Sequence, residues 1–171
     1  YKLETPLGRG GVGSVWRATH TSIGKAVAVK LLAVPAQSRS SMHHPHRLLR
    51  EAQSPSLLRP PNVVHVIDPG YADDGTPFIA MAPIQGRSLF EELHPGDGDA
   101  QRRGWAWTRD VALQVLDGLQ ACHAAGIVHR DIKPENVLIS SRSGTTSETG
   151  TWVTLVDFGI AFREDHSSDN P

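Results

Sequence analysis

The chain has 171 residues, of which 39% are hydrophobic and 20% charged, so a packed core is expected and wholesale disorder is not. Lys and Arg number 17 against 18 Asp and Glu, and this net charge of -1 argues against a nucleic-acid binder driven by bulk positive charge. The single cysteine, Cys122, excludes an intrachain disulfide framework and a cysteine-rich zinc site, and it favours a reducing, cytoplasmic location. No apolar run reaches the ~18 residues of a membrane span, although a longer parent protein could be anchored outside this segment.

The first half of the chain is predicted to be mainly β-structure. Strands are expected at 3–7 and 14–19, on either side of a glycine cluster, and at 26–32, where β-branched residues alternate. The Ser-, His- and Pro-rich stretch 35–45 is predicted to be a loop, and 46–54 a short helix that Pro55 ends or kinks. Two more short strands are expected at 63–67 and 78–81, joined through Asp73-Asp74-Gly75, a typical hairpin turn.

After Gly86 the pattern changes to helices. Ser88-Leu89-Phe90-Glu91 has the form of a capping box at the start of a short helix. Apolar residues at helical spacing predict a helix over about 108–125, with Gly126 as its stop signal. Short apolar segments follow at 127–128, 137–139 and 152–156, and the first two are predicted to be strands. The Ser-, Thr- and Gly-rich stretch 140–150 is expected to be an exposed hairpin loop without core residues. Strands followed by helices indicate an α+β fold in two lobes that join near 81–86.

The glycine cluster Gly8-x-Gly10-x-x-Gly13-x-Val15 lies between two predicted strands. Glycines at such a turn allow backbone N–H groups to approach phosphates closely. A dinucleotide-binding turn would need a helix after Gly13, whereas the residues that follow are typical of a strand. An ordinary glycine-rich hairpin is the alternative that this motif alone leaves open.

Lys30 stands at the end of an apolar strand, where burying an unpaired ammonium group is costly. Glu51, on the predicted helix 46–54, is a candidate anionic partner. The alternative is a lysine whose ammonium group reaches solvent.

The run His129-Arg130-Asp131-Ile132-Lys133-Pro134-Glu135-Asn136 places charged residues between two predicted apolar strands, where stability alone would not put them. Asp131 and Asn136 could reach one site from a single loop, and Asp157-Phe158-Gly159 adds a second carboxylate. A carboxylate with an amide oxygen suits Mg²⁺. A second, metal-free carboxylate suits a base that accepts a hydroxyl proton.

These motifs and their order resemble the eukaryotic-type (Hanks-type) protein kinase family, specifically its bacterial Ser/Thr members. The resemblance covers nearly the whole chain, and Lys133, two residues after Asp131, resembles the Ser/Thr-directed form of the catalytic loop. It implies a bilobal kinase fold. Residues 1–84 would form an antiparallel β-sheet N-lobe with one helix, followed by the hinge, and residues 85–171 an incomplete, mainly helical C-lobe through the start of the activation segment.

The resemblance also implies a role for individual residues. Lys30 would bind the α- and β-phosphates of ATP and pair with Glu51 in the active state. Asp131 would orient the substrate hydroxyl and accept its proton, and Lys133 would steady the γ-phosphate. The Mg²⁺ ligands would be Asn136 and Asp157. The ATP-binding set would be Leu7, Gly8, Arg9, Gly10, Gly11, Val12, Gly13, Ser14, Val15, Ala28, Lys30, Met81, Ala82, Ile84 and Leu138, with Met81 as gatekeeper and Ala82-Pro83-Ile84 as the hinge. His129 and Phe158 would be packing residues, and Pro83 lacks an N–H, so adenine contacts would use neighbours such as the Ile84 N–H.

The expected function is a Ser/Thr protein kinase that transfers the γ-phosphate of Mg·ATP to protein substrates, with no nucleic-acid partner. The alternatives are a catalytically inactive ATP-binding or scaffold module and, less favoured, a small-molecule kinase. Because no Ala-Pro-Glu motif follows Asp157-Phe158-Gly159, the chain is expected to be a C-terminally truncated kinase domain that is inactive by itself.

Overall fold

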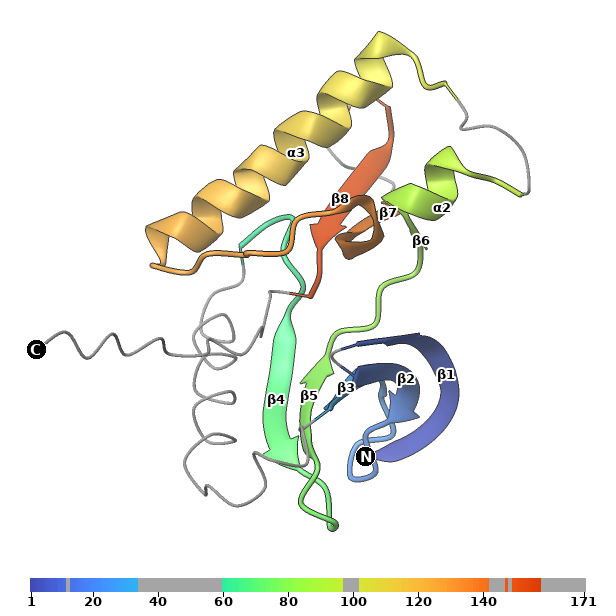
Figure 1. Ribbon diagram of the computed structural model, residues 1–171, viewed down its shortest axis with the longest axis vertical. Coiled ribbons are helices and arrows are strands. Elements are labelled where there is room, and N and C mark those ends of the chain that lie inside the picture. The colour runs from blue at the N-terminus through green and yellow to red at the C-terminus, as the bar shows by residue number, and fades with distance from the viewer. Residues whose placement is uncertain (12, 34–59, 97–101, 142–146, 148, 158–171) are drawn as a thin grey trace, which may run out of the picture.

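The computed structural model describes residues 1–11, 13–33, 60–96, 102–141, 147 and 149–157, which form two lobes (Figure 1). One lobe is a five-stranded sheet, and the other combines a three-stranded sheet with helices. The expected helix 46–54 with Glu51, as well as Pro55 and Phe158-Gly159, lie outside the described residues. Within the described ranges, no helix is both long and apolar enough to cross a membrane.

The first lobe is an antiparallel sheet with the strand order β1-β2-β3-β5-β4. Its strands are β1 (Lys2–Gly10), β2 (Gly13–Thr19), β3 (Ala26–Leu32), β4 (Val66–Tyr71) and β5 (Pro77–Met81). The strands expected at 3–7, 14–19, 26–32 and 78–81 are therefore confirmed. The predicted hairpin turn is also present: Gly75 has a φ of 80°, and the Thr76 N–H donates to Asp74 Oδ1 at 2.9 Å.

The strand expected at 63–67 is wrong in its position, because β4 runs from Val66 to Tyr71. Val63 instead makes an isolated parallel bridge to Leu155 of the second lobe. The sheet edge tolerates Pro69, which cannot donate a ladder hydrogen bond, so the strand continues past the point where the apolar run ends. An apolar pattern shows that Val63 and Val64 are buried, but it does not show which sheet they join.

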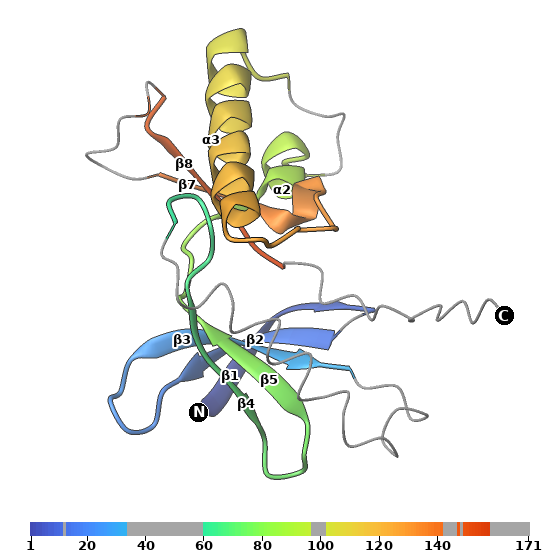
Figure 2. The same ribbon diagram turned by 90° about the vertical axis from the view of Figure 1, so that its left-hand side faces the viewer.

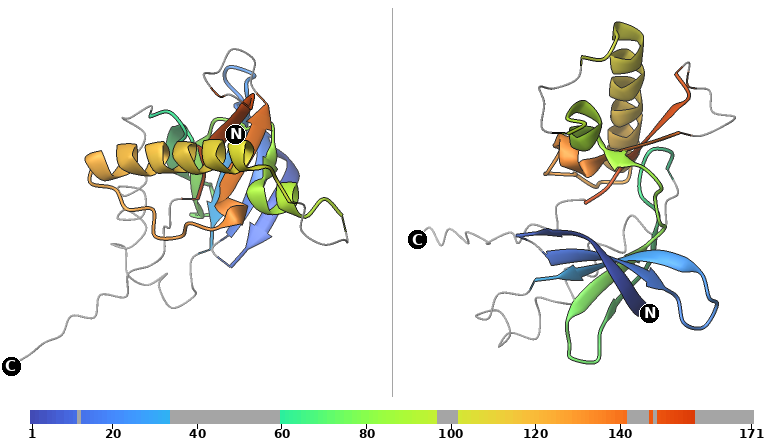
Figure 3. Two further views of the ribbon diagram at one scale, coloured as in Figure 1. Left: turned by 90° about the horizontal axis from the view of Figure 1, so that it is seen from above. Right: turned by 90° about the vertical axis from the view of Figure 1, so that its right-hand side faces the viewer.

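The second lobe consists of β6 (Arg87–Ser88), α2 (Leu89–Leu93), α3 (Trp105–Ala124), the 3-10 helix η2 (Pro134–Asn136), β7 (Val137–Ser141) and β8 (Thr151–Leu155). Its sheet has the order β6-β7-β8, and α3 packs against β8, as Figure 2 and the view from above in Figure 3 show. Their shared core is Val111, Val137, Ile139, Val153 and Leu155.

The expected helix starts and stops are largely confirmed. The capping box of α2 is complete: the Glu91 N–H donates to Ser88 Oγ at 3.1 Å, and the Ser88 N–H donates to Glu91 Oε2 at 2.8 Å. That backbone hydrogen bond from Ser88 lowers the pKa of Glu91. Helix α3 begins three residues earlier than predicted, at Trp105, and Gly126 follows its end with a φ of 74°.

One expectation for the second lobe is wrong, and another is confirmed only in part. Ile127-Val128 is not a strand, because the Ile127 N–H still bonds the Cys122 carbonyl as part of the helix C-cap, and Val128 is 57% exposed. The stretch 140–150 connects the antiparallel strands β7 and β8, as the expected hairpin loop does, but it is not fully exposed. In its described part, the Ser147 hydroxyl donates to Asp110 Oδ2 at 2.7 Å and the Thr149 hydroxyl donates to the same oxygen, which fastens this stretch to α3.

Candidate functional site

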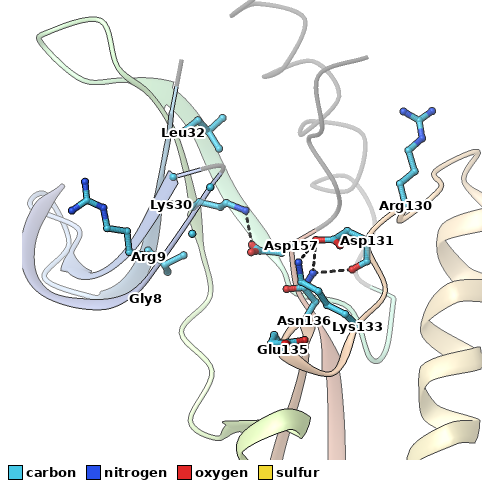
Figure 4. A pocket seen from close by; sticks show the side chains of 14 residues that line it. Gly8, Arg9, Lys30, Leu32, Arg130, Asp131, Lys133, Glu135, Asn136 and Asp157 are labelled. Atoms are coloured by element: carbon cyan, nitrogen blue, oxygen red, sulfur yellow. Dashed lines mark hydrogen bonds and ion pairs between the residues drawn. The ribbon is translucent and has the colours of Figure 1, made fainter. Parts of the chain in front are cut away.

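A cavity of about 730 Å³ is lined by residues of both lobes. The close-up of this cavity in Figure 4 shows Lys30 reaching from the five-stranded sheet towards the loops of the second lobe. Its lining residues are Gly8, Arg9, Gly10, Gly11, Gly13, Val15, Lys30, Leu32, Arg130, Asp131, Lys133, Glu135, Asn136 and Asp157. The structure therefore brings the glycine loop, the strand lysine and both motif carboxylates to one cavity, as the sequence predicts.

Lys30 and Asp157 form an ion pair across this cavity, with Lys30 Nζ 2.8 Å from Asp157 Oδ1. The lysine side chain is 7% exposed and the aspartate side chain 29% exposed. The strand pairing fixes the position of Lys30 on β3, where it lies opposite Val15 of β2 and Ile79 of β5. A nearly buried ammonium group needs a counter-charge, and Asp157 supplies it. Sequence reasoning did not name this pair, because the expected partner of Lys30 was Glu51.

Asp131 receives two side-chain hydrogen bonds on one oxygen. Lys133 Nζ lies 2.8 Å from Asp131 Oδ2, and Asn136 Nδ2 donates to the same atom at 2.9 Å. The Asn136 amide also donates to the Asp131 carbonyl at 2.8 Å, which folds the loop tightly around η2. The hydrogen bond from Lys133 holds the pKa of Asp131 below its usual value, so the group is a carboxylate at neutral pH. Arg130 has a φ of 63°, and its side chain points away from this cluster (Figure 4).

His129 connects the Asp131 loop to the segment that carries Asp157. The residue is 1% exposed, and its Nε2 donates to the Val156 carbonyl at 2.9 Å. The Val156 N–H in turn donates to the Asn136 carbonyl at 3.0 Å. His129 is thus a packing residue that holds the two loops in register.

Acid should weaken the fold through His129. Burial lowers the pKa of this ring below its ordinary value of 6.5, so the native state keeps it neutral while the unfolded chain takes up a proton. The free energy of unfolding should therefore fall as the pH drops below 6.5, and His129→Asn should lose part of that pH dependence. Urea unfolding at about pH 7.5 and about pH 5.5 measures this. The control is His123→Asn, at an exposed position. If it lost as much of the pH dependence of the unfolding free energy as His129→Asn does, that dependence would not come from His129.

The glycines of the loop divide into two kinds. A Cβ on Gly8, Gly10 or Gly11 would meet nothing within 4 Å, so the backbone there is open to the cavity and suits a phosphate cradle. Gly13 has a φ of 142°, and a Cβ on it would lie 1.9 Å from the Leu31 carbonyl oxygen. Gly13 is therefore required by close packing of β2 on β3. Val12 lies outside the described residues.

The residues expected around adenine lie near the cavity only in part. Ala28, Met81 and Ile84 belong to or pack against an apolar cluster that also contains the cavity residue Leu32. The lining of the 730 Å³ cavity does not include Leu7, Ser14, Ala28, Met81, Ala82, Ile84 or Leu138. In the segment expected to be the hinge, the Ala82 N–H donates to the His65 carbonyl at 2.9 Å. Because Pro83 has no N–H, the Ile84 N–H stays the predicted adenine donor.

Asn136 and Asp157 fit a magnesium ion. The Asn136 amide nitrogen is used by Asp131, so its oxygen is the atom left for a cation, and Asp157 Oδ1 bonds Lys30, which leaves Oδ2. In the described part of the chain, no three His, Cys, Asp or Glu side chains form a metal-binding group. Mg²⁺ commonly binds through one or two carboxylates together with substrate phosphates and water, so this sparse oxygen set is suitable.

Comparison with known proteins agrees with this geometry. The chain matches the protein kinase domain family over residues 1–170. It is 35% identical over its whole length to the serine/threonine-protein kinase pkn3 of Myxococcus xanthus, and 38% identical over 94% of the chain to the probable serine/threonine-protein kinase PknB of Corynebacterium glutamicum. The chain spans 29% and 23% of these two relatives.

Solved structures agree on the fold. The kinase domain of Mycobacterium tuberculosis PknI, in a double-mutant form, aligns with a TM-score of 0.74 and 25% identity. The alignment covers 95% of this chain and 59% of that one, which confirms the expected partial bilobal kinase fold. The chain therefore belongs to the protein kinase family, in the Hanks-type group of bacterial serine/threonine protein kinases.

Proposed function

We propose that this chain provides the ATP-binding and catalytic residues of a serine/threonine protein kinase that uses Mg·ATP. The observation that carries the proposal is the convergence of Lys30, Asp131 and Asp157 with the open glycines of the loop around one cavity. Phosphoryl transfer asks the protein mainly for positioning and charge neutralisation, which this arrangement can supply.

In the proposed reaction, a substrate Ser or Thr hydroxyl oxygen forms a bond to the γ-phosphorus while the bond to the β,γ-bridging oxygen breaks, and ADP leaves. Asp131, which is ionised at neutral pH, accepts the hydroxyl proton. Lys133 holds its ammonium group beside Asp131. In the proposed reaction, Lys133 steadies the γ-phosphate and Lys30 neutralises the α- and β-phosphates. Asn136 and Asp157 would hold Mg²⁺, which would supply positive charge to neutralise the phosphates of ATP.

Lys30→Met should weaken the binding of Mg·ATP. The substitution removes a nearly buried ammonium group whose hydrogen bonds to phosphate oxygens are charge-assisted, and such bonds contribute about 1.5–3 kcal/mol each. We expect an affinity loss of about tenfold to a hundredfold by calorimetry. The control Lys25→Met changes an exposed lysine in the turn between β2 and β3 and should bind as the wild type does. Equal affinities for the two variants would remove Lys30 from the site.

The activity itself is tested with the full-length protein that contains this chain, ATP labelled on the γ-phosphate, and a mixture of protein substrates and small metabolites. Label on phosphoserine or phosphothreonine after acid hydrolysis supports the proposal. Label on a metabolite alone would indicate a small-molecule kinase. Mg·ATP binding by calorimetry without any transfer would indicate the inactive ATP-binding module.

A further inference from the structure

The outer edge of β8 is completed largely by side chains. One edge of β8 pairs with β7, and β8 is the last strand of its sheet within the described residues. In an antiparallel pair, alternate residues turn their N–H and C=O groups to the opposite edge. On β8 these residues are Thr151, Val153 and Leu155. Buried backbone groups of this kind need partners.

Gln114 of α3 occupies the middle of this edge. Its Oε1 accepts the Val153 N–H at 3.0 Å, and its Nε2 donates to the Thr151 carbonyl at 3.0 Å. Asn62 continues the same row, because its Nδ2 donates to the Val153 carbonyl at 2.8 Å and to Gln114 Oε1 at 3.0 Å. Both side chains belong to buried residues. The two amides thus replace the backbone that a neighbouring strand would supply.

Backbone groups and one hydroxyl complete the two ends of the row. The Leu155 N–H donates to the Asn62 carbonyl at 2.8 Å, and the Val64 N–H donates to the Leu155 carbonyl at 2.9 Å. At the other end, the Thr151 N–H donates to Ser147 Oγ at 3.0 Å. Every outward N–H and C=O of Thr151, Val153 and Leu155 therefore has a partner.

The local backbone is shaped to allow this contact. Asn62 has a left-handed φ of 63°, which asparagine tolerates better than most residues. Gly118 of α3 lies opposite it, and a Cβ there would be 3.0 Å from the Asn62 carbonyl oxygen. A side chain at position 118 would therefore press on both the Asn62 backbone and Leu155 of β8.

This edge leads directly to Asp157. Strand β8 ends at Leu155, and Val156 is held by Asn136 and His129, so the backbone is fixed up to the residue that pairs with Lys30. Asn62 also precedes β4, and Figure 1 shows this segment rising from the five-stranded sheet to the end of β8. The same contact therefore fixes Asp157 and ties the lobe that carries Lys30 to the second lobe.

We propose that Gln114 and Asn62 are positioning residues, whose side chains complete the edge of β8 and thereby set Asp157 against Lys30. If the chain binds Mg·ATP as proposed above, Gln114 and Asn62 control how strongly Mg²⁺ and the nucleotide reinforce each other's binding. They act through β8 and do not line the cavity.

The test compares Gln114→Leu and Asn62→Gly with the control Gln120→Leu, an exposed glutamine on the same helix. Asn62→Gly removes the amide but keeps access to the left-handed backbone. Calorimetry with ADP, with and without Mg²⁺, gives the factor by which the cation strengthens nucleotide binding. In both variants, the factor by which Mg²⁺ strengthens ADP binding should be about tenfold smaller than in the wild type, as is typical when a residue that orients a metal ligand is lost. The control should keep the wild-type factor. Hydrogen exchange at the amides of 155–157 should also be about tenfold faster in both variants.

The proposal is overturned if folded Gln114→Leu and Asn62→Gly keep both the Mg²⁺ factor and the exchange rates of the wild type. If the wild type binds no nucleotide, the proposed function fails, while hydrogen exchange at 155–157 still decides the positioning role. Should Gln114→Leu fail to fold, Gln114→Glu keeps the volume and the acceptor for Val153, and it replaces the donor that faces the Thr151 carbonyl. It is expected to show the same two changes, and their absence would be equally decisive.

Discussion

Asp131→Asn is expected to lower phosphate transfer to protein substrates by about a hundredfold to ten-thousandfold, the range for loss of a general base. An amide cannot accept the hydroxyl proton, but it can still present one oxygen to Lys133 and Asn136, which both bond the same Asp131 oxygen. The loop should therefore keep its structure, and the affinity for Mg·ATP should change little. The measurement is kcat with a protein substrate in the full-length protein, together with nucleotide affinity and Tm.

The matched control is Asp117→Asn, which makes the same chemical change at an exposed position on α3. It should leave transfer unaltered. If Asp131→Asn transferred phosphate within about threefold of the wild-type rate, its carboxylate would not be the base that the proposed reaction requires. A loss of nucleotide affinity of the same size as the loss of kcat would instead point to a distorted loop.

The main groups around the cavity could be predicted from the sequence because each is out of place on stability grounds. Lys30 interrupts an apolar strand, and Asp131, Asn136 and Asp157 are polar residues next to apolar segments. Such residues need partners or a ligand, so their types and order point to one charged site. The structure brings all four to the same cavity, and their individual roles stay predictions.

Other features depend on distances that the sequence does not contain. The ion pair of Lys30 with Asp157 joins residues from different lobes, and no local pattern marks it. The position of β4 depends on which sheet accepts an apolar segment, which periodicity cannot decide. Gln114 did leave a signal, because it stands three residues after Val111 on the apolar face of α3, where a polar residue must find buried partners.

Gly13→Ala should destabilise the protein by about 2–5 kcal/mol, because it combines backbone strain with overpacking. Its φ of 142° is one that residues with a Cβ rarely adopt, and the added methyl would lie 1.9 Å from the Leu31 carbonyl oxygen. Relief would require β2 to move away from β3, which would displace Val15 and Lys30, directly paired across these strands. Urea unfolding monitored by circular dichroism measures the loss, and nucleotide affinity should fall with it.

Gly8→Ala is the contrasting change in the same loop. A Cβ at Gly8 meets nothing within 4 Å, so the free energy of unfolding should stay within about 0.5 kcal/mol of the wild type. Gly8 nevertheless lines the cavity, and a methyl group there would intrude on a phosphate that lies against the backbone, so Mg·ATP should bind more weakly. Gly13→Ala thus tests the packing of the loop, and Gly8→Ala tests the access of a phosphate to its backbone. If Gly8→Ala bound nucleotide normally, the loop would not cradle the phosphates, and if Gly13→Ala were as stable as the wild type, β2 and β3 would not be held by this close approach.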